Sequence, residues 1–188
     1  MLPPCPALLR SEPELVERLR VIQVMVPSRE TVESYASLRR RINELVGRVN
    51  STFSTPSAVP IHLIHRSLDE NEVTALYRAA DVMLVTPVRD GMNLVAKEFV
   101  AAQDPADPGV LILSRFAGAA QQLTDALIVN PFSREELAEA IARALAMERR
   151  ERVRRWESLM DVVTRFDVRV WRDSFVAALK AEREPEPI

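Results

Sequence analysis

The chain has 188 residues, of which 47% are hydrophobic and 28% are charged, and its formal net charge is -2. These values indicate one folded domain rather than a disordered chain, and the nearly neutral charge provides no attraction to nucleic acid or to an anionic membrane. The single cysteine, Cys5, excludes an internal disulfide and fits a reducing compartment. No apolar run approaches the roughly 20 residues that span a bilayer, and the first ten residues lack the basic start of a secretory signal, so we expect a cytoplasmic protein.

Strands and helices are predicted to alternate along the chain. Residues 1–10 are rich in proline and predict an irregular start. Five apolar runs rich in valine and isoleucine predict strands at 21–26, 60–65, 82–86, 110–113 and 126–129. Apolar residues at helical spacing predict helices that end near residues 20, 50, 80, 103 and 147, followed by two more within 149–181. Three helices are expected to begin at capping boxes, which are Ser11–Glu14, Ser67–Glu70 and Ser133–Glu136.

This alternation predicts an α/β fold in which a parallel, Rossmann-like sheet is covered by helices on both faces. Ligands of such sheets bind beyond the carboxyl ends of the strands. The polar loops that follow the first four strands should therefore open on one edge of the sheet; they are 27–29, 65–68, 89–93 and 115–118.

The stretch from Val82 to Phe99 combines a buried strand, a short polar loop and the start of a helix. This arrangement binds phosphates in open α/β sheets, because the first turn of a helix has unpaired N–H groups. Gly91, one of only 4 glycines, suggests a positive φ or a close approach of a ligand to the backbone. The alternative is an ordinary turn in which Asp90 or Asn93 caps the helix.

The residues of this stretch and of five others carry a family resemblance. The six stretches lie at 26–35, 43–50, 60–62, 84–99, 101–120 and 128–132. Three of them read V-P-S-R-E-x-V-x-x-Y (26–35), L-V-T-P-V-R-D-G-M-N-L-V-A-K-E-F (84–99) and I-V-N-P-F (128–132). In this order they closely resemble trehalose-6-phosphate synthases, which are retaining glycosyltransferases of the GT-B fold. The resemblance covers residues 8–180 and implies the C-terminal, donor-binding half of such an enzyme. It implies transfer of glucose from a nucleotide-glucose, UDP-glucose or GDP-glucose, to glucose 6-phosphate with retention.

The resemblance also implies roles for single residues. Arg29 matches the arginine that binds the acceptor phosphate, although alone it would be a solvated residue of a first helical turn. Asp90 matches the carboxylate that accepts hydrogen bonds from the donor glucose, and it is our candidate catalytic residue. Glu98 matches the glutamate that takes both ribose hydroxyls.

The remaining implied contacts to the donor are mostly made by the backbone. The amides of Leu94 and Val95 would hold the donor phosphates at the helix N-terminus. Leu68 would line the base, whereas alone it would be a residue beside a helix start, and Lys97 alone would be a surface residue. The implied donor-binding set is Leu68, Asp90, Gly91, Met92, Asn93, Leu94, Val95, Ala96, Lys97 and Glu98.

No metal or other cofactor is expected. His62 and His65 lie three residues apart on one strand and therefore point to opposite faces, which makes them poor partners for a metal. The absence of a G-x-G-x-x-G motif argues against a nicotinamide or flavin domain. The arginines between 149 and 155 alternate with glutamates and predict a solvated helix face.

The resemblance predicts a Rossmann-like nucleotide-sugar-binding domain at 11–148, helices at 149–181 and a frayed tail at 182–188. The family has a preceding domain, and an R-x-D-x-x-K-G segment that contacts the pyrophosphate, which these 188 residues lack. Since one electrostatic donor contributes about 3–4 kcal/mol to catalysis, we expect the chain alone to be inactive. An incomplete sheet would favour homo-oligomers. The alternatives are a truncated module that binds nucleotide sugar or oligomerises without catalysis, and a related synthase with another phosphorylated polyol acceptor.

Overall fold

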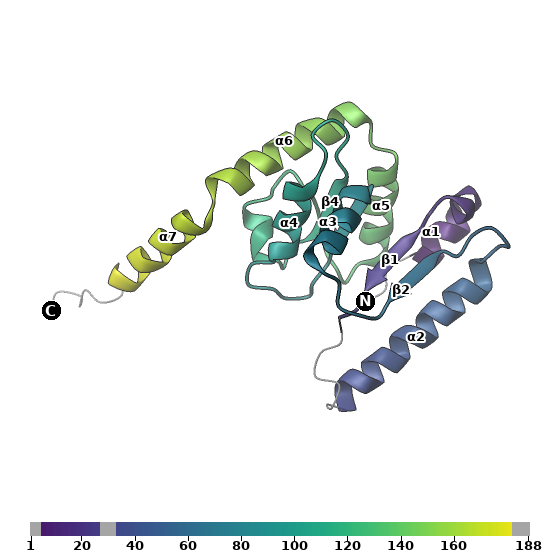
Figure 1. Ribbon diagram of the computed structural model, residues 1–188. Coiled ribbons are helices and arrows are strands. Elements are labelled where there is room, and N and C mark those ends of the chain that lie inside the picture. Colours follow the sequence, from purple (N-terminus) through teal and green to yellow (C-terminus); the bar gives the residue numbers. More distant parts are fainter. Residues whose placement is uncertain (1–4, 27–32, 182–188) are drawn as a thin grey trace. The chain divides into compact units, whose positions relative to one another are not determined.

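The computed structural model describes residues 5–26 and 33–181 (Figure 1). The described residues separate into two compact units. The first holds the residues up to Ala75 together with Ser133–Ala142, and the second holds Leu76–Phe132 and the residues from Arg143 onward. Parallel strands and helices build both units, which confirms the predicted α/β class. No helix in the described part of the chain has the length and apolarity that crossing a membrane requires.

Two parallel strands and a long helix form the centre of the first unit. Strand β1 (Val21–Val24) pairs with β2 (Ile61–Ile64), and helix α2 (Glu33–Phe53) packs along them (Figure 1). The Asn50 side chain joins the helix to the strand, since it donates to the Ile61 carbonyl at 2.9 Å and accepts from the Ile61 amide at 3.0 Å. Of the apolar positions predicted to face the core, Val46 and Val49 are buried and Ile42 packs beside them, whereas Leu38 and Leu45 are exposed.

The start of the chain differs from the prediction. Residues Cys5–Ser11 form helix α1, where the prolines predicted an irregular segment, and the following turn is a 3-10 helix, η1 (Pro13–Glu17). The side chains of Leu8 and Leu9 are buried. Burial of these two leucines outweighs the local effect of Pro6, which lies in the first turn of α1, where a proline is tolerated.

Helix α3 (Glu70–Ala79) begins with a different capping box from the predicted one. The Asp69 carboxylate accepts from the Glu72 amide at 2.9 Å, and the Glu72 carboxylate accepts from the Asp69 amide at 3.1 Å. Arg66 donates to both oxygens of Glu72, at 2.9 Å and 2.6 Å. The predicted cap at Ser67 is therefore wrong. Arg66 holds the Glu72 carboxylate in a position where it accepts from the Asp69 amide.

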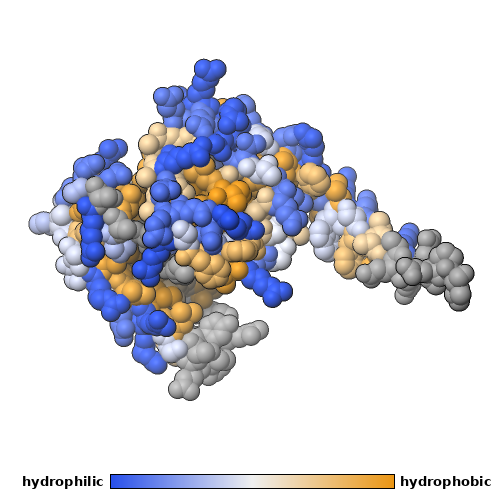
Figure 2. Space-filling model, turned by 180° about the vertical axis from the view of Figure 1, so that it is seen from behind, coloured by the Kyte–Doolittle hydropathy of each residue, from blue (hydrophilic) through white to orange (hydrophobic). Residues whose placement is uncertain are grey.

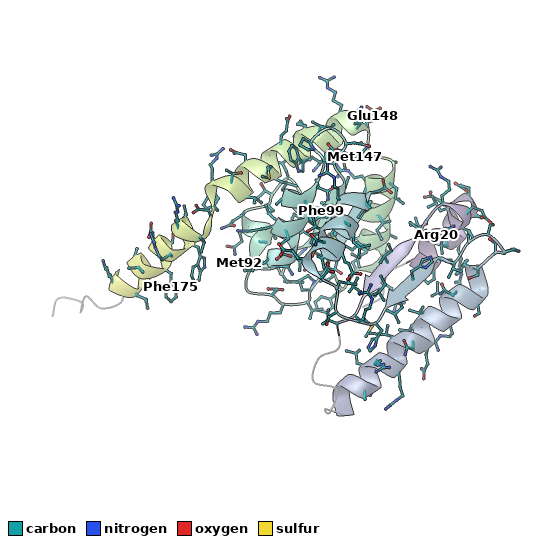
Figure 3. All side chains as sticks on the ribbon, viewed as in Figure 1. Arg20, Met92, Phe99, Met147, Glu148 and Phe175 are labelled. Atoms are coloured by element: carbon teal, nitrogen blue, oxygen red, sulfur yellow. The ribbon has the colours of Figure 1, made fainter. Side chains whose placement is uncertain are left out.

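A three-stranded parallel sheet lies at the centre of the second unit. Its order is β3 (Val82–Val85), β4 (Val110–Ser114) and β5 (Leu127–Val129), and every residue of β4 is buried. Helix α4 (Leu94–Ala102) packs on this sheet through Phe99, labelled in Figure 3, which is 1% exposed. The strands pair only within their units in the described structure, so a single five-stranded sheet stays a prediction.

Helix α6 (Arg149–Arg165) covers α4, as its apolar stripe predicts. The indole nitrogen of Trp156 donates to the Val100 carbonyl at 2.9 Å. The prediction of a solvated arginine face is wrong for two residues: Arg152 donates to the Pro108 carbonyl at 2.7 Å, and Arg155 donates to the Asp125 carbonyl at 2.8 Å. These guanidinium groups anchor the helix on the loops that flank β4 and β5.

Helices α5 and α7 differ in how much of their surface is buried: α5 has buried apolar side chains and α7 has none in its described part. Helix α5 (Arg134–Leu145) begins at the predicted capping residue Ser133, whose hydroxyl accepts from the Glu136 amide at 3.1 Å. Helix α7 (Val168–Ala181) is exposed along its described length, and its aromatic rings Trp171 and Phe175 stack at 5.4 Å. Figure 2 shows apolar surface among polar residues on this helix.

Candidate functional site

The candidate site lies where the loops after β3 and β4 meet at the carboxyl ends of the two strands. The Asp90 amide donates to the Phe116 carbonyl at 3.2 Å, and the Gly118 amide donates to the Asp90 carbonyl at 3.0 Å. One step further, the Ala119 amide donates to the Met92 carbonyl at 2.7 Å. The predicted convergence of polar loops is therefore confirmed for this pair of strands. These backbone hydrogen bonds hold the two loops in a fixed position relative to each other.

Gly118 lets the two loops come together. A Cβ atom at this position would collide with the carbonyl oxygen of Gly91 and lie 2.8 Å from its carbonyl carbon. Gly91 itself has room for a side chain and does not have a positive φ. The prediction of a positive φ, which rested on the small number of glycines in the chain, is therefore wrong. The close backbone approach at Gly91 is made by Gly118, which is the reason why the second loop needs a glycine.

Asn93 holds the left-handed conformation instead, with φ 75° and ψ 88°. Its side-chain oxygen accepts from the Ala96 amide at 3.0 Å, which confirms Asn93 as the helix cap. Its side-chain nitrogen donates to Asp90 Oδ2 at 2.9 Å, and the Met92 amide donates to Asp90 Oδ1 at 3.1 Å. Asparagine tolerates this conformation because its short polar side chain forms such local bonds.

The Asp90 carboxylate is fixed by these two bonds, one on each oxygen. A carboxylate offers about four acceptor positions, so one acceptor position on each oxygen remains for a ligand. The residue is half-buried. A carboxylate that is fixed by hydrogen bonds and keeps open acceptor positions is suited to neutral hydroxyl donors. Its negative charge disfavours a phosphate at the same place.

The first turn of α4 presents backbone amides beside Asp90. Leu94 and Val95 are 59% and 37% exposed, and they occupy the first two positions after the Asn93 cap. The N–H groups of a first helical turn have no partner inside the helix, and the helix dipole favours negative charge there. The Ala96 amide is taken by the Asn93 cap and its side chain is fully buried.

Glu98 lies one helical turn after Leu94 and is exposed on the same face of α4. Its Oε2 accepts from the Tyr77 hydroxyl at 3.4 Å. Burial raises the pKa of Tyr77, and the charge of Glu98 raises it further, so the phenol stays a donor at neutral pH. Tyr77 could not be predicted from the sequence, because no local pattern indicates a contact between residues 21 positions apart.

The other predicted site residues are placed as follows. Met92, labelled in Figure 3, is half-buried on the loop, Lys97 is half-buried on α4, and Leu68 is half-buried in the first unit. Arg29 lies outside the described residues. The structure brings residues 90–98 together in one unit. Within the described part of the chain, no three His, Cys, Asp or Glu side chains gather to hold a metal ion.

Comparisons with known proteins show which family the chain is similar to. Residues 2–181 match glycosyltransferase family 20. The trehalose-6-phosphate synthase of Escherichia coli is 44% identical over 174 residues, which are 93% of this chain and 37% of that protein. The chain therefore spans a little over a third of the length of the curated relatives it matches.

Solved structures give the same result. A structure from Escherichia coli bound with UDP-2-fluoro glucose has a TM-score of 0.88 and 44% identity, and it covers 93% of this chain and 39% of that one. The UDP-forming alpha,alpha-trehalose-phosphate synthase of Burkholderia xenovorans, in complex with glucose-6-phosphate, has a TM-score of 0.88 and 44% identity, with 91% and 37% covered. Since the family match extends over nearly the whole sequence, this chain belongs to glycosyltransferase family 20.

Proposed function

We propose that this chain is the donor-binding part of a trehalose-6-phosphate synthase, which transfers glucose from a nucleotide-glucose to glucose 6-phosphate with retention. The proposal rests on one observation: three kinds of group lie close together on one loop and the helix that follows it. Asp90 is a fixed carboxylate, Leu94 and Val95 present exposed amides at a helix N-terminus, and Glu98 is a second carboxylate one turn away. Such a sequence of groups matches the hydroxyls, the diphosphate and the ribose of a nucleotide sugar.

Each group has a chemical role in this proposal. The amides of Leu94 and Val95 bind the diphosphate, where the helix dipole offsets part of its charge. Asp90 accepts hydrogen bonds from glucose hydroxyls on the acceptor positions that Met92 and Asn93 leave open. The diphosphate is the leaving group, so its stabilisation favours cleavage of the bond to the sugar.

The contributions of the remaining residues are part of the same proposal. Glu98 accepts the two ribose hydroxyls, Leu68 lines the base, and Arg29 binds the phosphate of glucose 6-phosphate. The backbone of Gly91 and Asn93 faces the sugar. The donor is bound without a divalent ion, as the family resemblance implies. Two relatives support the substrates: one is bound with a UDP-glucose analogue, and the other is in complex with glucose-6-phosphate.

The proposal is tested by calorimetric titration of UDP-glucose, GDP-glucose and UDP into the 188-residue chain. We expect saturable binding of one nucleotide-glucose, tighter than binding of the nucleotide without sugar. Asp90→Asn should weaken nucleotide-glucose binding about tenfold, because it removes a charged acceptor, and should leave UDP binding nearly unchanged. Binding is the property tested because the chain spans only 37% of the length of its curated relatives.

Asp81→Asn provides the matched control. Asp81 is exposed and precedes β3, at the opposite end of the same strand from the candidate site. This variant should bind UDP-glucose as the original chain does. No binding of either nucleotide-glucose at millimolar concentration, or an equal loss in both variants, would overturn the proposal.

A further inference from the structure

Tyr77 is fixed at the end of α3 by contacts on its backbone and on its ring. Its carbonyl accepts from the Gln103 side chain at 2.6 Å, and the same side chain accepts from the Gly109 amide at 2.7 Å. Gln103 is only 4% exposed, so this bridge is shielded from water. The ring packs edge-on against Phe99, with centroids 6.3 Å apart and planes at 85°. The hydroxyl of Tyr77 is therefore presented from a rigid position.

Glu98 has no comparable restraint of its own. It is exposed on α4, next to the buried Phe99, and its long side chain can adopt several rotamers in solution. In the described part of the chain, the hydrogen-bond partner recorded for its carboxylate is the Tyr77 hydroxyl, 3.4 Å from Oε2. This distance is long for an O–H···O bond, so the bond adds little to the stability of the fold.

The chemistry of this partner matters for ligand binding. A neutral hydroxyl restrains the carboxylate without cancelling its charge, whereas an arginine would occupy both oxygens in a fork. Tyr77 reaches one oxygen and leaves the other open. A restrained carboxylate with free acceptor positions is suited to two adjacent hydroxyl groups, such as the 2′ and 3′ hydroxyls of a ribose.

We propose that Tyr77 is a positioning residue that holds the Glu98 carboxylate in the orientation that accepts the ribose hydroxyls of the donor. The inference rests on the proposed function, in which Glu98 binds the ribose. It adds that the preference of this chain for a ribonucleotide depends on the hydroxyl of Tyr77. The pre-ordered side chain reduces the entropy that is lost when the ligand binds.

The test compares UDP with 2′,3′-dideoxy-UDP, which lacks both ribose hydroxyls, by calorimetric titration into the 188-residue chain. The original chain should bind UDP more tightly than the dideoxy compound. Tyr77→Phe keeps the ring against Phe99 and removes only the hydroxyl. It should weaken UDP binding about twofold to threefold, the lower end of what a hydrogen bond contributes, and leave binding of the dideoxy compound unchanged. A purely structural role would weaken both ligands equally.

Two further variants separate this inference from the proposed function. Glu98→Gln should lose most of the preference for UDP, and Tyr77→Phe added to Glu98→Gln should change nothing more. If Glu98→Gln keeps the full preference, Glu98 does not bind the ribose and the proposed function fails at this residue. If Glu98→Gln loses the preference but Tyr77→Phe keeps the original ratio of affinities, the role of Tyr77 is overturned. An unchanged unfolding midpoint of Tyr77→Phe verifies that the fold is intact.

Discussion

The loop after β3 shows how single residues share the conformational demands of the candidate site. Sequence inspection assigns the unusual backbone to Gly91, but Asn93 adopts it, and its side chain caps α4 and holds Asp90 at the same time. A glycine at position 93 would adopt the conformation more easily and would lose both side-chain bonds. The residue type is therefore explained by the contacts of its side chain, which local sequence rules do not show.

Gly118→Ala is expected to destabilise the chain by about 1–3 kcal/mol, because the added methyl group collides with the backbone of Gly91 and both loops must shift. The shift should also weaken UDP-glucose binding, since the Gly118 amide donates a hydrogen bond to the Asp90 carbonyl. Urea unfolding followed by circular dichroism measures the first effect, and calorimetry measures the second.

Gly47→Ala is the matched control for this substitution. Gly47 lies inside α2, and beyond its chain neighbours and the helix's own backbone no atom lies within 4 Å of an added Cβ, so alanine should stabilise the chain by about 0.5–1 kcal/mol. Equal effects of the two substitutions would contradict the assignment of Gly118 to a loop contact.

At the level of elements, patterns within one segment were predictable and contacts between distant segments were not. The runs of valine and isoleucine predict all five strands, and the bounds of β2, β3, β4 and β5 match to within one residue. The burial of Arg152 and Arg155 depends on partners from other segments, Pro108 and Asp125. Such partners are brought close only by the fold, so their effects do not show in local spacing.

The candidate site follows the same division. Residues 90–98 could be predicted because one continuous stretch contains the strand end, the loop and the helix start, and the family resemblance gives them roles. Tyr77 and Gly118 contribute from other segments, and only the folded chain shows which groups of Glu98 and Gly91 they contact.

The two tryptophans test which helix contributes to the core. Trp156→Phe on α6 should destabilise the chain by about 1–2 kcal/mol, because it removes the hydrogen bond to the Val100 carbonyl and part of a packed ring. Trp171→Phe on α7 should change the stability by less than about 0.5 kcal/mol, because Trp171 is 53% exposed. Urea unfolding followed by circular dichroism compares them, and a larger effect at Trp171 would show that α7 is packed in solution.

The whole molecule carries several carboxylates whose pKa values are lowered by folding. A hydrogen bond from Arg66, assisted by the Asp69 amide, lowers the pKa of Glu72 from 4.5 to about 2. Hydrogen bonds from Thr55 and Ser57 lower the pKa of Glu17, and a hydrogen bond from Arg155 lowers that of Glu151. These groups occur in both units, so their protonation affects the chain as a whole.

The sign of the resulting pH dependence follows from linkage. A carboxylate with a lowered pKa in the folded state binds fewer protons than in the unfolded state, so its contribution is present above pH 4.5 and is lost as the pH falls toward about 2. The free energy of unfolding should therefore decrease steadily from pH 5 to pH 2 and change little between pH 5 and pH 7. Glu72→Gln should make this decrease smaller, because glutamine does not titrate. Salt at about 1 M screens exposed ion pairs and should reduce the decrease as well. Urea midpoints measured from pH 2 to pH 7 decide the matter: the same slope with and without Glu72 would show that the Arg66 contact does not persist in solution.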